Sequence, residues 1–145
     1  MIHFHTEDIK FVFKNKTEIK QWITSVAKGK KRKVGDLSFV FCSDGFLLRL
    51  NKEYLNHDTL TDIITFDYSK DDNQLPISGD IYISIDRIRE NAVKFNKSFE
   101  NELHRVIIHG TLHLLGYADK TKAAKLEMTK QEDIALNLLS KQSVK

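Results

Sequence analysis

The sequence is poor in cysteine and has no long apolar run, and both scarcities restrict its class. Cys42 is the only cysteine, so the chain can form no internal disulfide, which fits a reducing cytoplasm. No apolar run approaches the roughly 20 residues of a membrane-spanning helix, and Met1 to Lys10 lacks the pattern of a signal peptide. Repeats, linkers and low-complexity segments are also missing. We therefore expect a cytoplasmic protein with no membrane partner.

The overall composition is ordinary for a globular domain. The 145 residues are 41% hydrophobic and 30% charged, which describes a soluble protein long enough to bury one core. The formal charge of +3 permits a polyanionic partner but does not by itself argue for one. We predict a single domain over residues 1–145, and we favour a monomer.

Hydrophobic patterning predicts a mixed architecture. Strand patterns occur within residues 1–13 and at Leu37–Cys42, Thr61–Tyr68 and Gly79–Ile85. Helical spacing occurs at Lys16–Lys28, Asp44–Asn56 and Asp86–Asn96, from about Phe99 onward, and at Thr121–Leu139. Strands and helices are interleaved, but two strands are nearly adjacent along the chain. We predict an α+β fold, in which a small mixed sheet of about four strands packs with about five helices and the helix from Phe99 is central.

Three local details follow from the same patterns. The apolar segment 11–13 is expected to belong to the opening strand. Asn15 and Glu18 have the spacing of a capping box, which predicts that they start the first helix. The last helix is expected to bury three aliphatic side chains: Leu126, Ile134 and Leu138.

The densest basic run is Lys28–Lys33, which reads Lys-Gly-Lys-Lys-Arg-Lys. We favour a solvated loop between a helix and a strand, because charged runs usually face water. The alternative interpretation is an edge that contacts the phosphates of a nucleic acid.

Two histidines and a carboxylate form a candidate metal site. His109 and His113 are four residues apart on the helix that begins near Phe99, so they stand one turn apart on one face. Unbroken helix would carry Asp119 to the wrong side, but Gly116 can adopt the left-handed conformation that ends helices. The chain can then fold back and bring Asp119 to the two imidazoles. Three protein ligands with an open position are typical of a catalytic zinc.

Each of these residues also has a structural interpretation. A lone histidine on a helix is usually a surface residue or a hydrogen-bonded core residue. Asp119 precedes a segment with helical spacing, so it is also a good N-cap for the last helix. The combination of the paired histidines, the glycine and the third donor favours the metal site.

The wider pattern resembles a known family. The segment His109-Gly110-x-Leu112-His113-Leu114-x-Gly116-Tyr117 closely resembles the signature of the YbeY family of endoribonucleases. Three further blocks match that family in order: Leu50-Asn51 with Tyr54, Thr61-Asp62-Ile63 to Phe66, and Gly79-Asp80-Ile81. The resemblance implies a metal-dependent, single-strand-specific RNA hydrolase that acts in small-subunit ribosomal RNA maturation and ribosome quality control. It also implies one zinc-like ion held by three side chains, with ribosomal RNA and the small ribosomal subunit as partners.

The chain departs from the family pattern at two positions. The family's usual third ligand is a histidine, and here that position is Asp119. A carboxylate makes the metal a weaker Lewis acid, so Zn²⁺ remains the expected cofactor but Fe²⁺ or Ni²⁺ is an alternative. Leu55 stands where the family has an arginine that is a candidate phosphate contact. The sequence offers four substitutes: Arg49, Lys52, His57 and Arg105.

Neighbouring residues indicate which reaction to expect. Zinc metalloproteases carry a general-base glutamate directly after the first histidine, and here Gly110 follows His109, so a protease is the weaker hypothesis. RNA depends less on such a base, because its 2′-hydroxyl is an internal nucleophile and the ion would polarise a phosphoryl oxygen. Arg105 is the candidate catalytic residue that neutralises the phosphate, and Glu102 is a candidate for steadying a ligand. Leu55 supports the remaining alternative, a non-catalytic ribosome-assembly factor with a structural metal.

Overall fold

The computed structural model describes residues 1–57, 59–69, 72 and 74–143 and contains four strands and five helices over them. Their order is β1 (Ile2–Thr6), α1 (Lys16–Gly29), β2 (Val34–Cys42), α2 (Asp44–Leu55), β3 (Ile63–Asp67), β4 (Ile77–Ser84), α3 (Ile85–Lys94), α4 (Phe99–Leu114) and α5 (Lys122–Ser143). The predicted α+β fold is confirmed. Over the described ranges, no helix is both long and apolar enough to cross a membrane.

The four strands form one mixed sheet in the order β1-β2-β4-β3. β2 pairs in parallel with both β1 and β4, whereas β3 runs antiparallel to β4, its neighbour along the chain. Over the part of the chain that the structure describes, β3 is therefore an edge strand, with one side free of strand partners. Its residues alternate between the two faces of the sheet, so Ile63, Thr65 and Asp67 share one face.

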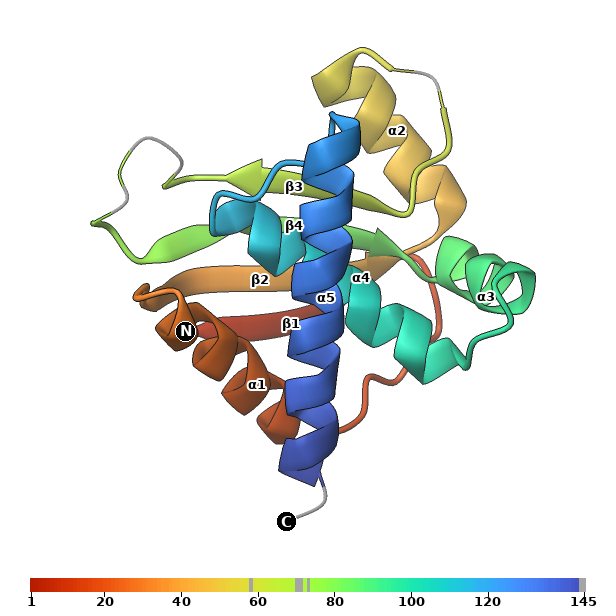
Figure 1. Cartoon of the computed structure of the whole chain (residues 1–145). Coiled ribbons are helices and arrows are strands. Elements are labelled where there is room, and N and C mark those ends of the chain that lie inside the picture. Colours follow the sequence, from red (N-terminus) through yellow and green to blue (C-terminus); the bar gives the residue numbers. More distant parts are fainter. Residues whose placement is uncertain (58, 70–71, 73, 144–145) are drawn as a thin grey trace.

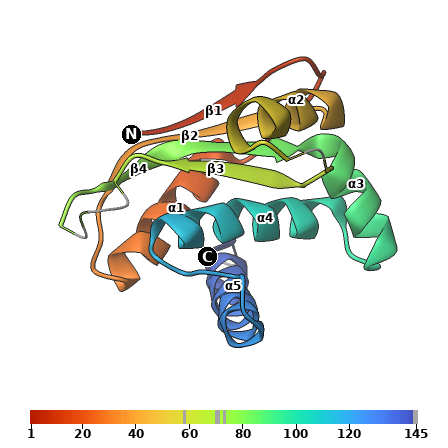
Figure 2. The same cartoon turned by 90° about the horizontal axis from the view of Figure 1, so that it is seen from above.

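Helices cover the two faces of the sheet unequally. Figures 1 and 2 show α1 and α4 against one face, α5 crossing beyond them, and α2 on the opposite face. The main core lies between the sheet and α1 and α4, and it is filled by alternate residues of the two central strands. These fully buried strand residues are Leu37, Phe39, Phe41, Ile77, Ile81 and Ile83.

Helix α4 occupies the centre of this arrangement, as predicted, because it contacts β3, β4, α3 and α5. Gly110 faces the sheet at the closest point. A Cβ atom there would lie 2.9 Å from the Ile63 Cδ1 and Ile81 Cγ2 atoms, closer than carbon atoms normally approach. The lack of a side chain at Gly110 therefore lets α4 approach the sheet and places His109 and His113 beside β3.

The single tryptophan joins the first helix to the last. The Trp22 side chain is 0% exposed, and its Nε1–H donates a hydrogen bond of 2.7 Å to the Ala135 carbonyl oxygen. A buried indole N–H normally finds such a partner. This contact fixes α5 over α1 and α4 and so determines which of its side chains reach the site.

Two details predicted for the N-terminal region are wrong. Residues 11–13 lie outside β1, and the Phe13 ring instead packs against the rings of Phe4 and Phe41, with centroid distances of 4.6 and 4.9 Å. Asn15 has a left-handed backbone with φ of 61°, and its side chain makes no capping hydrogen bond to α1. A capping side chain requires an extended backbone at that position, so the capping-box spacing was misleading.

The predicted inner face of α5 is also wrong. Leu126, Ile134 and Leu138 are exposed, and the buried stripe consists of Met128, Glu132, Ala135 and Leu139. This stripe has an equally regular helical spacing, but one member is a glutamate. Hydrophobic patterning therefore favoured the other face, because it assigns a charged residue to the solvent.

Candidate metal site

A glycine turn ends α4 and returns the chain toward the two histidines. Gly116 has φ of +104°, its N–H donates to the His113 carbonyl (3.0 Å), and the Tyr117 N–H donates to the Leu112 carbonyl (3.0 Å). These two bonds form the Schellman arrangement, which satisfies the last carbonyl groups of a helix. The chain reverses at the residue that the sequence singled out.

Gly116→Ala should lower the free energy of unfolding by about 1–2 kcal/mol, because an L side chain disfavours this backbone conformation. The added Cβ would meet no atom within 4 Å, so the cost is conformational rather than steric. Urea denaturation of the metal-free protein measures it. Gly29→Ala is the matched control, since Gly29 has the same open surroundings without a positive φ. Equal stabilities of the two variants would contradict the argument.

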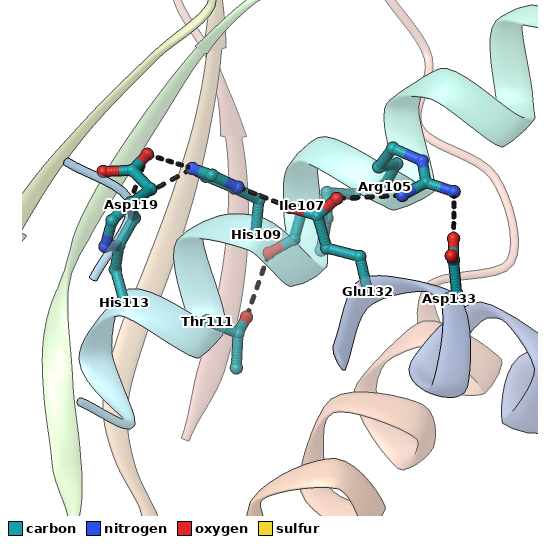
Figure 3. Close-up of polar contacts among 8 residues, drawn as sticks. All are labelled: Arg105, Ile107, His109, Thr111, His113, Asp119, Glu132 and Asp133. Atoms are coloured by element: carbon teal, nitrogen blue, oxygen red, sulfur yellow. Dashed lines mark hydrogen bonds and ion pairs between the residues drawn. The ribbon is translucent and has the colours of Figure 1, made fainter. Parts of the chain in front are cut away.

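The turn places three donor atoms in a small triangle. The Nε2 atoms of His109 and His113 are 3.1 Å apart, and the Asp119 Oδ2 atom lies 3.3 Å from each of them. Figure 3 shows the Asp119 carboxylate facing both rings. The three side chains are 21%, 26% and 38% exposed, so they are supported by protein yet open to solvent on one side. The three could hold a metal ion.

The dimensions of the triangle fit a small divalent cation. In a tetrahedral zinc site, ligand atoms about 2.0–2.1 Å from the ion are about 3.3 Å apart. The edges of 3.1, 3.3 and 3.3 Å match one face of such a tetrahedron and leave the fourth position for solvent or substrate. Two imidazoles and one carboxylate are a donor set that Zn²⁺ and Fe²⁺ both accept.

The alternative role of Asp119, as the cap of the last helix, is filled by another residue. The Thr121 Oγ1 atom accepts a hydrogen bond of 3.0 Å from the Ala124 N–H in the first turn of α5. The Asp119 carboxylate is therefore free of that role and faces the imidazoles.

A buried glutamate supports His109 from the far side of its ring. The Glu132 Oε2 atom lies 2.6 Å from His109 Nδ1, and its Oε1 atom accepts a bond of 2.9 Å from Arg105 Nη1. Arg105 Nη2 in turn donates to Asp133 Oδ1 at 2.7 Å. Figure 3 shows this line of contacts on one side of His109, with His113 and Asp119 on the other.

The same contacts change the acidity of His109. Burial lowers the pKa of the His109 imidazole, but the hydrogen bond to Glu132 raises it. The charges of Glu132, Asp119 and Asp62 raise it further, and the net result is a pKa above the ordinary histidine value. Carboxylates near the ring therefore favour positive charge at this position, whether from a proton or from a cation.

Glu132 is the residue of the site that the sequence analysis missed. It lies 23 residues beyond His109 and reaches it only because α5 packs over α4. Its one signal in the sequence is its place between Met128 and Ala135 at helical spacing. Among the described residues, Glu132 rather than Glu102 contacts the imidazole.

The triangle opens into a cavity of about 410 Å³ between β3, α4 and α5. Thr61, Asp62 and Thr65 line it from β3 and the residues before that strand, so this segment borders the site. Of the four candidate substitutes for an arginine at Leu55, Arg105 lines this cavity. Arg49 lies on α2, on the opposite face of the sheet, with its guanidinium over the Phe46 ring.

Two further carboxyl groups in this cavity have perturbed acidity. Burial is the main cause that raises the pKa of Asp62 and of Glu102. The charge of Glu132 raises both further, and the charge of Asp62 also raises the pKa of Glu102. Glu102 is only 7% exposed. The positive charge of Arg105 lowers the pKa of Glu102 and so offsets part of this rise.

Glu102→Gln should raise the free energy of unfolding at pH 7 by about 1 kcal/mol, because an amide has no charge to bury. In the folded state the raised pKa of Glu102 means that its ionisation opposes folding. That penalty appears as the pH rises above the unfolded value of about 4.3 and is complete above the folded pKa. The advantage of Gln should therefore vanish near pH 4, which denaturation of the metal-free protein at both pH values measures. Glu100→Gln, the same substitution at an exposed position of the same helix, is the matched control.

Comparisons with known proteins point to the same family over nearly the whole chain. A family model described as "Endoribonuclease YbeY" matches residues 1–140. A protein of that name from Flavobacterium psychrophilum is 49% identical over 138 residues, covering 95% of this chain and 96% of the relative. Another from Phocaeicola vulgatus is 46% identical over 140 residues, covering 97% and 99%. The solution structure of TM1509 from Thermotoga maritima superposes with a TM-score of 0.66 at 28% identity, covering 97% of this chain and 93% of that one.

Proposed function

The chain belongs to the YbeY family of endoribonucleases, and we propose that it is itself a metal-dependent endoribonuclease that cleaves single-stranded RNA. The observation that carries this proposal is the donor triangle of His109, His113 and Asp119 at the edge of an open cavity. Both the family and the site thus support hydrolysis of an RNA phosphodiester bond.

In this proposal the triangle holds one divalent ion, with Zn²⁺ favoured and Fe²⁺ or Ni²⁺ as alternatives. A bound ion of this kind supplies Lewis-acid polarisation of a phosphoryl oxygen. Glu132 accepts the Nδ1–H of His109, which leaves the lone pair of Nε2 directed toward the triangle. The carboxylate thereby selects the ring tautomer and orientation that a ligand needs.

Arg105 is proposed to contact the substrate phosphate. Its guanidinium lines the cavity and uses two of its five N–H donors on Glu132 and Asp133. The remaining donors can bind a phosphate oxygen without breaking these two contacts.

The edge strand beside the site supports the proposed preference for single strands. Among the described residues, β3 has no strand partner on its outer side, and the cavity follows the strand. An extended polynucleotide can lie along such an edge, whereas a duplex is too wide to bring one phosphate to donor atoms partly enclosed by α4 and α5. Exposure of 21–38% for the three side chains agrees with access for one strand.

We further propose that the cellular substrates are precursors of small-subunit ribosomal RNA and that the protein acts as a cytoplasmic monomer in ribosome maturation and quality control. Family membership is the support for this assignment. The ribosomal small subunit would then be its partner, and defective ribosomal RNA would be among its targets.

Elemental analysis of the purified protein, combined with cleavage of a fluorescent single-stranded RNA, tests the proposal. We expect about one equivalent of a transition metal and cleavage that is lost on chelation and restored by adding the ion back. Stoichiometric metal without any cleavage would instead support a ribosome-assembly factor with a structural ion. Cleavage of casein would favour a protease. Gly110 opposes that alternative, because it stands where a zinc protease has its general-base glutamate and even a Cβ atom there would clash with Ile63 and Ile81.

A further inference from the structure

A second cavity adjoins the metal site on its other side. It has a volume of about 300 Å³ and shares His113 and Asp119 with the first. The first cavity is lined by Thr61 and Thr65, whereas the second is lined by Asp67 and Ser69 farther along the same segment. The two cavities therefore follow each other along β3, with the donor triangle between them.

The two cavities differ in charge. Three acidic residues, Asp62, Glu102 and Glu132, line the first cavity, and its one guanidinium is that of Arg105, already paired with Glu132. Among the described residues that line the second cavity are two cations, Arg32 and Lys120, and one carboxylate outside the triangle, that of Asp67. Lys30 adds further positive charge, because its Nζ atom lies 5.3 Å from the centre of the Tyr117 ring in the lining.

Arg32 has donors available for a ligand. Its Nη2 group donates to the Leu75 carbonyl oxygen at 3.0 Å, which holds the guanidinium in place. Its buried Nε–H has no hydrogen-bond partner among the described residues. Buried donors are rarely left without a partner in native proteins. The basic run Lys28–Lys33, for which a solvated loop was favoured, thus delivers a half-buried arginine to the cavity beside His113.

We propose that, apart from the contact of Arg105 with the phosphate at the cleaved bond, the RNA strand lies along β3 with its ionic contacts on one side of that bond only. Arg32 and Lys120 bind the phosphates of the nucleotides in the second cavity, and the acidic first cavity binds its nucleotides without comparable ionic contacts. The acidic side chains of the first cavity repel phosphates. The strand is therefore held through its phosphates in the second cavity, beyond His113. The inference takes its substrate class, RNA, from the proposed function.

Arg32→Ala and Lys120→Ala test these contacts with a short fluorescein-labelled single-stranded RNA, measured by anisotropy in EDTA so that no cleavage occurs. Each variant should weaken binding about fivefold at low salt. Each should also reduce the slope of log affinity against log salt concentration by about 0.7, the value for one phosphate contact on a single strand. In cleavage assays with metal-loaded protein, KM should rise while kcat stays nearly constant.

Two further variants separate charge from structure. Arg32→Lys keeps the positive charge and should retain most of the salt dependence, even if the contact with Leu75 is weakened. Lys141→Ala removes a charge in the last turn of α5, about 28 Å along the helix from Lys122, and should bind RNA like the wild type. Equal losses in Lys141→Ala and Lys120→Ala would overturn the proposal, because they would indicate a diffuse charge effect.

RNAs with uncharged methylphosphonate linkages locate the contacts. Neutral linkages on the side of the cleaved bond that lies in the second cavity should weaken RNA binding. Neutral linkages on the side that lies in the first cavity should leave binding unchanged. Equal effects on both sides would overturn the inference. Binding with the expected slopes but no cleavage would contradict the proposed function alone, whereas cleavage with wild-type binding by both Ala variants would contradict this inference alone.

Discussion

His113→Ala is expected to weaken metal binding by at least about 100-fold and to reduce RNA cleavage to background. Loss of a residue that merely supports a ligand already costs about 10- to 100-fold in affinity, and loss of a ligand should cost more. Here the substitution removes one corner of a triangle whose edges are 3.1–3.3 Å. The remaining imidazole and carboxylate cannot enclose an ion. Metal content after dialysis and the rate of RNA cleavage measure the two effects.

The fold should survive this change, because the His113 side chain is 26% exposed and does not belong to the core. Circular dichroism and the urea midpoint of the metal-free protein check that expectation. His5→Ala, at an exposed histidine on β1, is the matched control and should retain both metal and activity. Full cleavage by His113→Ala would mean that the triangle does not hold the catalytic ion.

Glu132→Ala is expected to weaken metal binding about 10- to 100-fold while leaving all three donor residues in place. Glu132 holds the His109 ring through the 2.6 Å contact at Nδ1, and without it the ring can rotate and take the other tautomer. Glu132→Gln should lose less, because an amide oxygen of the same length can still accept from Nδ1–H. Competition with a chromogenic chelator measures the affinities.

A nuclear magnetic resonance signal separates this positioning effect from general damage. In the metal-loaded wild type, the Nδ1–H of His109 should give a protected, strongly hydrogen-bonded proton resonance, which Glu132→Ala should abolish. Asp133→Asn is the control, because the exposed Asp133 reaches the site only through Arg105. Wild-type affinity in Glu132→Ala would show that His109 is oriented by the rest of α4 instead.

The part of the site that the sequence predicted is the part that depends on local geometry. His109, His113, Gly116 and Asp119 lie in one helix and the turn that follows it, so helical spacing and one glycine conformation determine their arrangement. The overall fold was predictable for a similar reason, because alternation and helical spacing reflect burial in single elements. The metal-binding role of these residues stays a prediction until an ion is measured.

The residues that the sequence did not reveal reach the site through tertiary packing. Glu132 depends on the crossing of α5 over α4, and Arg32 depends on the loop that joins α1 to β2. In α5 the buried stripe contains a charged residue because its partners, His109 and Arg105, lie on another helix. Asn15 illustrates a similar limit, since its left-handed backbone, which residue spacing does not reveal, goes with a side chain that does not cap α1.

The contact between Trp22 and Ala135 gives this protein an internal optical probe. The chain has a single indole, it is fully buried, and its N–H is bonded to the helix that carries Glu132 one turn earlier. Detachment of that helix would expose the ring to water and move its emission to longer wavelengths. Intrinsic fluorescence during a titration with metal, or in stopped-flow mixing, can therefore follow the docking of the C-terminal helix without any attached dye.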